Sequence, residues 1–90
     1  MRTSNKFLKD LRRLKKRSPQ DFLRLEGVVE VLAENGHKGL DKKHRAHRLS
    51  GNYKAYWECH VKPDLLLIWD ENEELMLIEL VRTGTHADLF

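Results

Sequence analysis

The sequence predicts an α+β domain in which an N-terminal helical hairpin packs on a mostly antiparallel sheet. Two segments with the apolar spacing of helices occupy the first 35 positions, and segments typical of strands occupy most of residues 53–82. Helices that precede a run of strands, instead of alternating with them, favour this class. Because no repeat, linker or low-complexity tract divides the 90 residues, we expect one domain spanning 1–90.

The first predicted helix begins after Ser4, which can act as its N-cap. Its apolar stripe consists of Phe7, Leu8, Leu11 and Leu14. A second start signal, Ser18-Pro19-Gln20-Asp21, combines an N-cap serine with a proline at the first helical position and an acid in the first turn. The stripe of this second helix consists of Phe22, Leu25, Val28, Val29 and Leu32, and Asn35-Gly36 ends it. The short link between the two predicts a helical hairpin.

The next segment predicts a polar connection followed by a strand. Residues 37–48 are basic and lack an apolar period, so we expect a loop in which His37 and His44 are solvated. Residues 53–61 then alternate with the period of a strand. The face that we expect to point inward carries Tyr53, Ala55, Trp57, Cys59 and Val61, and the other carries Lys54, Tyr56, Glu58 and His60.

Two further strands complete the predicted sheet. Lys62-Pro63-Asp64 predicts a turn, because proline fixes its own φ and cannot donate to a sheet ladder. Leu65–Trp69 is apolar on both faces, as in a central strand. We expect a hairpin loop at residues 70–73 and a strand at 75–82. Residues 1–3 form either a short strand or a frayed end, and residues 83–90 show no clear period.

Composition places the chain among small globular proteins of a reducing compartment. Hydrophobic residues make up 40% and charged residues 34%, and the aliphatic runs after residue 60 exclude a disordered chain. The longest of these runs, Leu65–Trp69, is far short of the roughly 18 residues that cross a bilayer. The single cysteine, Cys59, cannot form an internal disulfide, and no secretory signal precedes the first helix. We therefore expect a cytoplasmic protein that does not associate with membranes.

The charge is distributed unevenly along the chain. Residues 1–54 contain 15 Lys and Arg against 6 Asp and Glu, whereas residues 55–90 contain 2 against 8. Such asymmetry favours a basic face that binds a polyanion such as nucleic acid. A merely solvated basic helix explains the pattern about equally well.

The histidines are the residues best suited to chemistry. His44 and His47 are three positions apart, but no paired cysteines or H-E-x-x-H signature supports a zinc site, and the neighbouring Lys43 and Arg45 repel cations. We therefore expect no metal and no cofactor. No nucleophile motif surrounds Cys59, which we expect in the core.

A different arrangement pairs His60 with Asp64 across the Pro63 turn. RNA cleavage requires a base for the 2′-hydroxyl, an acid for the departing 5′-oxygen and positive charge near the phosphate. Histidines can supply the base and the acid near neutral pH without a metal. Taken alone, the pair is weak support, because a surface histidine beside an aspartate is usually incidental.

Three ordered motifs carry a resemblance to a known family. The first is His47-Arg48-Leu49-Ser50-Gly51-Asn52-Tyr53-Lys54-Ala55-Tyr56-Trp57, the second is His60-Val61-Lys62-Pro63-Asp64, and the third is Arg82-Thr83-Gly84-Thr85-His86-Ala87-Asp88-Leu89-Phe90. Together they closely resemble the YafQ branch of the RelE/ParE toxins. The resemblance covers most of the chain, and its specific motifs lie in residues 47–90.

The resemblance implies the toxin of a bacterial type II toxin–antitoxin system, an endoribonuclease that cuts mRNA in the ribosomal A site. It implies a microbial-RNase-like βααβββ fold and catalytic roles for His47, His60, Asp64 and His86. Phe90 is expected to contact RNA, and Arg82 to stabilise the phosphate in the transition state. With the basic loop, the expected RNA-binding residues also include Lys42, Lys43, Arg45, Arg48 and Lys54.

The resemblance also implies partners, namely a cognate antitoxin and the 70S ribosome with its mRNA. We expect the toxin alone to be a monomer and to form a heteromeric complex with the antitoxin. Two alternatives remain at this point. A ParE-like toxin would bind gyrase without catalysis, although such proteins lack this histidine set, and a ribosome- or RNA-binding module would explain the charge alone.

Overall fold

The computed structural model describes residues 1–51 and 55–90, and its elements follow the predicted order. Strand β1 (Arg2–Thr3) precedes helices α1 (Asn5–Arg17) and α2 (Pro19–Asn35). Two short 3-10 turns, η1 (Gly36–Gly39) and η2 (Lys42–His44), lead to β2 (His47–Arg48). Strands β3 (Trp57–Lys62), β4 (Leu65–Asn72) and β5 (Leu77–Gly84) and a last helix, α3 (His86–Leu89), complete the chain.

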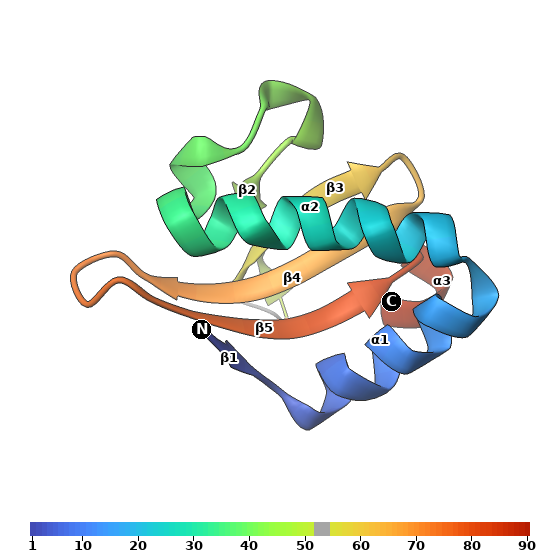
Figure 1. The fold of residues 1–90 in the computed structure, drawn as a ribbon. Helices are drawn as coiled ribbons and strands as arrows, with labels where there is room; N and C mark the ends of the chain where they lie inside the picture. Colours follow the sequence, from blue (N-terminus) through green and yellow to red (C-terminus); the bar gives the residue numbers. More distant parts are fainter. Residues whose placement is uncertain (52–54) are drawn as a thin grey trace.

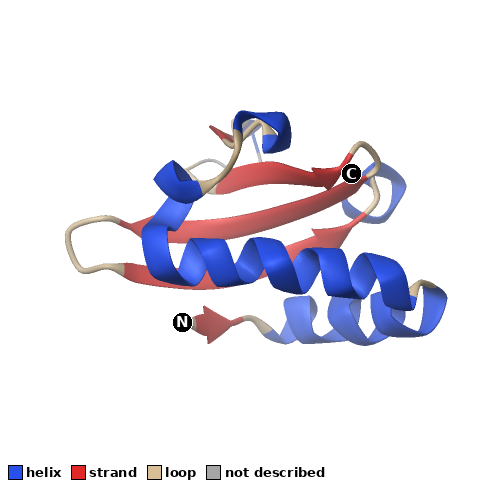
Figure 2. Cartoon of the chain, turned by 45° about the horizontal axis from the view of Figure 1, so that its top comes forward, coloured by secondary structure: helices blue, strands red, loops and turns tan. Residues whose placement is uncertain are grey.

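The strands form a mixed, mostly antiparallel sheet with the order β1-β5-β4-β3-β2 within the described residues. Only the pair of β1 with β5 is parallel among these, and β4 lies at the centre. Figures 1 and 2 show α1 and α2 side by side against one face of this sheet. The predicted α+β class and the helical hairpin on a mostly antiparallel sheet are therefore confirmed. None of the helices in the described ranges is long and apolar enough to span a membrane.

The helix boundaries follow the capping residues that the sequence predicts. The Ser4 hydroxyl accepts a hydrogen bond from the Phe7 backbone N–H at 3.0 Å, and the Ser18 hydroxyl accepts one from Asp21 at 3.3 Å. Gly36 ends α2 with a φ of 66°, a conformation that favours glycine. The link between the helices is Ser18 alone, which is the C-cap of α1 and the N-cap of α2.

The main core lies between the helices and the sheet. It is built from buried side chains of α1, α2 and the three long strands: Phe7, Leu14, Leu25, Val28, Leu32, Cys59, Val61, Leu65, Leu67, Trp69 and Leu80. Cys59 is thus a core residue, as predicted. The prediction was wrong for Leu8, which is 40% exposed, whereas Asp10 is buried because it binds β5.

A smaller apolar cluster covers the opposite face of the sheet. Leu66 and Ile68 of β4 meet Leu89 of α3 there, and Leu49, Tyr56 and Val81 pack against them. The two clusters confirm that the central strand is apolar on both faces, with Leu65–Trp69 fully buried.

Several strand boundaries differ from the predictions. The strand expected at 53–61 begins only at Trp57, because Ala55 has a φ of 76° that no strand allows; Tyr53 and Lys54 lie outside the described residues. Strand β4 continues through the acidic residues that we expected in a loop, since Asp70 and Glu71 pair with Glu79 and Ile78 of β5. The turn therefore falls at residues 73–76.

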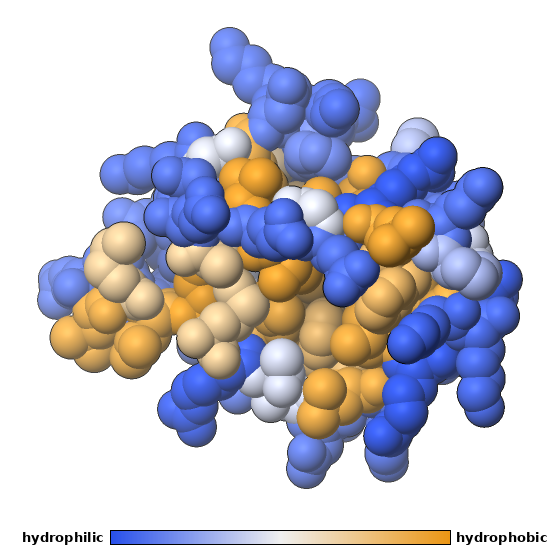
Figure 3. All heavy atoms as spheres, viewed as in Figure 1, coloured by the Kyte–Doolittle hydropathy of each residue, from blue (hydrophilic) through white to orange (hydrophobic). Residues whose placement is uncertain are grey.

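The two segments in which the sequence shows no apolar periodicity, residues 37–48 and 83–90, also contain secondary structure. His47 and Arg48 form strand β2 at the edge of the sheet, inside the segment expected to be loop. Residues 86–89 form α3, because Thr85 and Asp88 make a capping box with each other's backbone. The tip between β4 and β5 exposes Leu75, Met76 and Leu77, which form the apolar left end of the molecule in Figure 3.

Candidate active site

The predicted catalytic residues lie toward one end of the sheet, largely on the face that α1 and α2 leave uncovered. Strand register pairs His60 with Leu66, and Leu66 with Gly84. Two interstrand spacings of about 4.8 Å thus separate the His60 and Gly84 backbones, and His86 follows Gly84 by two residues. Asp64 lies in the turn that ends β3 at the same edge.

His47 lies on edge strand β2 with its imidazole exposed. Its Nδ1 lies 2.8 Å from the Arg45 carbonyl oxygen. Since a carbonyl only accepts, Nδ1 carries a proton that it donates, and Nε2 is the nitrogen that can take up a further proton. Nε2 lies 3.4 Å from Glu58 Oε1 on the neighbouring strand.

Glu58 is the residue of this face that sequence reasoning missed. The strand period places it on the face of His60, but Glu58 is only 4% exposed. It is paired directly with His47 across β2 and β3. The alternating pattern of a strand predicts the face on which a residue lies but not how deeply it is buried. The burial of Glu58 depends on residues outside β3, which the sequence of the strand does not reveal.

His60 lies on β3, two positions after Glu58 and half-buried. Its Nδ1 lies 3.3 Å from the carbonyl oxygen of Pro63. The predicted pair between His60 and Asp64 is not formed among the described residues, because the turn directs this carbonyl toward the ring and leaves Asp64 exposed. Asp64 is therefore near the candidate site without binding His60.

His86 and Phe90 lie at either end of the short helix α3. The two rings have centroids 5.5 Å apart and are tilted by 38°. His86 is exposed, and Phe90 is 64% exposed. Leu89 is the apolar residue that covers this end of the sheet, whereas Phe90 is not part of the buried cluster.

Arg82 of β5 is held by α1. Its Nε donates to Asp10 Oδ2 over 2.7 Å, and a terminal nitrogen donates to Asp10 Oδ1 over 3.2 Å. Equal strand parity places Arg82 and His86 on one face only if the chain stays extended through Gly84, and the chain instead turns into α3 after Gly84. A role for Arg82 at the phosphate stays a prediction.

The cationic residues predicted to bind RNA follow α2 in the chain. Lys42, Lys43, Arg45 and Arg48 are all exposed, whereas Lys54 lies outside the described residues. The guanidinium of Arg48 lies 5.3 Å from the centre of the Trp57 ring, a cation–π contact that orders it.

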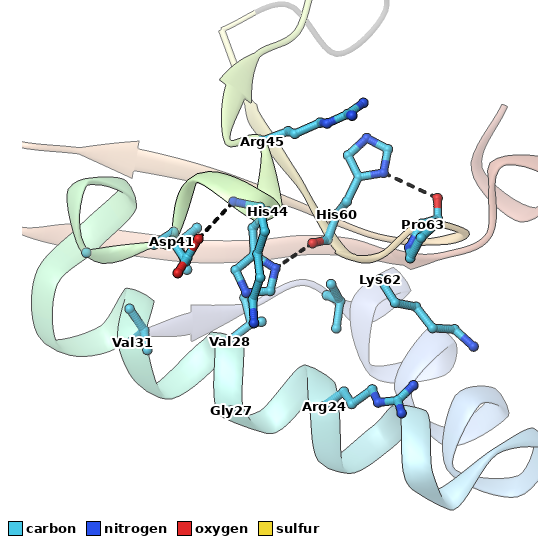
Figure 4. Close-up of a pocket in the computed structure, with 14 residues that line it drawn as sticks. Arg24, Gly27, Val28, Val31, Asp41, His44, Arg45, His60, Lys62 and Pro63 are labelled. Carbon is cyan, nitrogen blue, oxygen red and sulfur yellow. Dashed lines mark hydrogen bonds between the residues drawn. The ribbon is translucent and has the colours of Figure 1, made fainter.

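A groove of about 840 Å³ separates this segment from α2 (Figure 4). Apolar side chains line part of it, namely Val28, Val31, Leu40 and Val61. Cationic side chains line another part, namely Arg24, Lys43, Arg45 and Lys62, and Asp41 is the one acidic residue of the lining. His44 and His60 meet in this groove, where His44 Nδ1 lies 2.7 Å from the His60 carbonyl oxygen. The groove therefore suits an anionic ligand that also has apolar groups.

His37 and His44 are not solvated, contrary to the prediction. His37 stacks on Trp57 with ring centroids 4.0 Å apart, and its Nδ1 donates to Glu71 Oε2 at 2.7 Å. Burial acts to raise the pKa of Glu71, but hydrogen bonds from Trp69 and His37 outweigh it and lower the pKa. The isolated sequence gives no signal for these contacts, which join His37 to residues 20 and 34 positions further along the chain.

The same residues are candidates to hold a metal. His37, Glu71 and Glu73 offer ligand atoms that all lie within 4.8 Å of one another. An ion at this point would have to replace the proton that His37 donates to Glu71, and both Glu71 oxygens already accept hydrogen bonds. The set lies on the side of the sheet that carries Trp57, away from His47 and His60.

Comparisons with known proteins give one consistent result. Residues 1–90 match a family model described as "Bacterial toxin of type II toxin-antitoxin system, YafQ". The mRNA interferase toxin YafQ of Escherichia coli K12 is 36% identical over 87 residues, which are 97% of this chain and 90% of the relative.

Solved structures agree with this match over nearly the whole chain. The E. coli DinJ-YafQ complex contains a chain that is 34% identical, with a TM-score of 0.87 and coverage of 99% of this chain and 94% of that one. A metal-bound toxin from Helicobacter pylori is 42% identical, with a TM-score of 0.83 and coverage of 99% and 96%.

Proposed function

Since the chain belongs to the YafQ family of bacterial type II toxin–antitoxin toxins, we propose that it cleaves mRNA in the ribosomal A site by metal-independent acid–base chemistry. The chain is a toxin of this class and an mRNA interferase, that is, an endoribonuclease. Within this class of activity, we propose that the cut occurs in the ribosomal A site and that it requires no metal.

The proposed reaction uses the RNA's own 2′-hydroxyl as nucleophile. A base removes its proton, the 2′-oxygen attacks phosphorus, and the bond to the 5′-oxygen breaks as an acid protonates that oxygen. The products are a 2′,3′-cyclic phosphate and a 5′-hydroxyl. His47, His60, Asp64 and His86 are the candidates for these proton transfers, with His86 as the acid.

The observation that carries this proposal is the placement of the imidazoles. His47 and His60 lie on neighbouring strands on the face opposite α1 and α2, and His86 begins the helix that caps the same end of the sheet. His47 and His86 are exposed and His60 is half-buried, so a polymeric substrate can reach each of them. Phe90, beside His86, is placed to stack on a base.

We propose two partners for the basic surface, defined here as Lys42, Lys43, Arg45 and Arg48 with the cations of α1. On the ribosome it contacts rRNA, mainly through phosphates. In the resting cell a cognate antitoxin covers it with an acidic or amphipathic segment, as the mixed lining of the groove supports. The E. coli relative likewise forms a complex with DinJ, and we propose that the free toxin is a monomer.

The test is an incubation of purified protein with mRNA, with and without ribosomes, followed by analysis of the fragment ends. We expect cleavage only with ribosomes, a cyclic or 3′-phosphate and a 5′-hydroxyl, and no effect of a chelator that leaves the ribosomes intact. A 5′-phosphate product contradicts the mechanism. Cleavage of free mRNA contradicts the ribosomal site.

A further inference from the structure

One histidine and two glutamates converge where the end of α2 meets the β4–β5 hairpin. His37 lies in the 3-10 turn η1 that follows α2, Glu71 lies near the end of β4, and Glu73 lies in the turn after it. Each offers one ligand atom, and these atoms all lie within 4.8 Å of one another. This is the one group of its kind within residues 1–51 and 55–90.

Both carboxylates approach the same ring nitrogen. His37 Nδ1 lies 2.7 Å from Glu71 Oε2 and 3.5 Å from Glu73 Oε1. Two ligand atoms of a tetrahedral zinc ion, each about 2.1 Å from the metal, are separated by about 3.4 Å. The distance to Glu73 therefore already suits an ion, whereas Glu71 Oε2 has to move outward when the ion replaces the proton on Nδ1. That proton is released to solvent.

Contacts outside the cluster hold two of its three side chains in place. The other oxygen of Glu71, Oε1, accepts hydrogen bonds from Trp69 Nε1 and from the His37 backbone N–H, both at 3.0 Å. The His37 ring stacks on Trp57, with centroids 4.0 Å apart and planes 18° from parallel. Outer contacts of this kind orient metal ligands and strengthen metal binding. They leave Glu71 Oε2 and His37 Nδ1 directed at each other.

The surroundings of the two carboxylates leave room for an ion and its water. A cavity of about 260 Å³ adjoins them, and both Glu71 and Glu73 are part of its lining. Gly36 keeps the space beside Glu71 open, because a Cβ at this position would lie 2.8 Å from Oε2. Lys38 is the one cation of the lining, and its side chain is exposed, so the two carboxylates give the site a net negative charge.

We propose that His37, Glu71 and Glu73 bind one Zn²⁺ ion, with a water molecule as the fourth ligand. An imidazole nitrogen with carboxylate oxygens suits Zn²⁺, whereas Mg²⁺ prefers oxygen ligands alone. The ion joins the turn after α2 to the β4–β5 hairpin, so it stabilises the fold by binding the native state. The site lies away from His47 and His60, so the inference does not depend on the proposed cleavage mechanism.

The two tryptophans of the chain provide a local readout, because both contact the proposed site. Trp57 stacks on His37, and Trp69 donates a hydrogen bond to Glu71. An ion that moves the Glu71 carboxylate and takes the place of the His37 proton changes the surroundings of both indole rings. Tryptophan fluorescence therefore reports binding at this point without a measurement of enzyme activity.

The experiment is a titration of the purified protein with ZnCl₂, followed by tryptophan fluorescence. The fluorescence change should saturate at one ion per chain, and the melting temperature should rise with the concentration of ZnCl₂. MgCl₂ at the same concentrations should cause neither effect. The inference is overturned by a protein without a saturable response to ZnCl₂, or by one that responds equally to MgCl₂.

Variants of the proposed ligands locate the ion. His37→Ala should abolish the response to ZnCl₂. Glu73→Gln should weaken binding by at least about 10-fold, the smallest loss usual for removal of even an outer contact. Because the Glu73 side chain is half-exposed, this variant keeps the test valid should His37→Ala fail to fold. Glu74→Gln is the matched control, since Glu74 is an exposed acid of the same turn outside the cluster, and it should bind ZnCl₂ as wild type does.

A last variant separates this site from the histidines of the candidate active site. His86→Ala should retain the full fluorescence response, because His86 lies in α3 and outside the cluster. Loss of the response in His86→Ala, or wild-type affinity in Glu73→Gln, overturns the inference. A wild-type protein that binds ZnCl₂ in this way but does not cleave ribosome-bound mRNA overturns only the proposed function, so the two failures are distinct.

Discussion

Asp10 of α1 binds Arg82 of β5 through both of its carboxylate oxygens, across 72 residues of sequence. The same carboxylate accepts the Thr83 backbone N–H at 3.1 Å and a nitrogen of Arg13 at 3.2 Å. Asp10 is 4% exposed, so these four donors satisfy a charge that is almost fully removed from water. This one side chain fixes helix α1 on the strand that leads to His86.

The first prediction concerns this anchor. Asp10→Asn keeps the size of the side chain but removes the negative charge from a buried position on which four donors converge, so the free energy of unfolding should fall by about 3 kcal/mol. Urea denaturation measures it. Asp70→Asn on the exposed part of β4 is the control and should change stability by less than about 0.5 kcal/mol. Equal effects of the two variants contradict the proposed anchoring.

The second prediction concerns pH and Asp88. Hydrogen bonds from the Arg17 guanidinium and from the Thr85 backbone lower the pKa of Asp88 to about 2. Because the folded pKa lies below that of an ordinary aspartate, about 3.9, the carboxylate contributes its full stability above about pH 4 and loses it as pH falls through about 2. Asp88→Asn should therefore be less stable than wild type at pH 7, and the difference should disappear toward pH 2. Urea midpoints at a series of pH values measure this, and a difference that grows below pH 4 contradicts it.

The third prediction separates two neighbouring residues of α3. Phe90 is exposed beside His86, and base stacking contributes about 1–3 kcal/mol per base, so Phe90→Ala should slow cleavage with almost no change in melting temperature. Leu89→Ala, in contrast, removes a buried side chain and should lower stability by about 2–4 kcal/mol. A large loss of stability in Phe90→Ala argues against the stacking role.

The fourth prediction concerns the basic surface. Replacing Lys42, Lys43 and Arg45 with Ala should weaken ribosome binding and reduce the slope of log K against log salt by about 2, since each phosphate contact contributes about 0.7 on single strands. Binding measured between low and moderate salt gives this slope. Arg2→Ala, on β1 at the opposite edge of the sheet, is the control and should leave it unchanged. An unaltered slope in the triple variant means that these cations face away from rRNA.

The fifth prediction concerns the histidines. His47→Ala, His60→Ala and His86→Ala should each lower single-turnover cleavage by roughly 10²–10⁴-fold, the usual contribution of one acid–base group. His37→Ala is the control, because His37 stacks on Trp57 away from these residues; it should reduce stability more than cleavage. Cleavage by His86→Ala at the wild-type rate excludes His86 as the acid.

The sequence allows the helices to be predicted better than the sheet edges. Ser4 and Ser18 signal helix starts by their own side chains, and the local signal is sufficient because the hydrogen bonds are local. Strand ends depend on partners instead. Asp70 and Glu71 remain in β4 because β5 pairs with them. Ala55 lies outside the strand because its φ is positive, a conformation that an alanine in the sequence does not predict.

The candidate site shows the same division. The motifs around His47, His60 and His86 can be recognised in the sequence, and the strand register brings them to one end of the sheet. The sequence does not predict the contacts of Glu58, His37 and Arg82. Each contact involves a residue from a different element, so it exists only once the sheet has formed.

The parallel pair of β1 with β5 has a consequence for the synthesis of the toxin. Arg2 and Thr3 pair with Glu79 and Leu80, and Ser4 donates its backbone N–H to the Leu80 carbonyl. β1 must therefore wait for β5 to be synthesised, and contacts of such long sequence separation form slowly. A nascent chain without β5 has neither the pairing of β1 nor His86, so a cell that makes this toxin is exposed to its activity only after β5 and α3 have been translated.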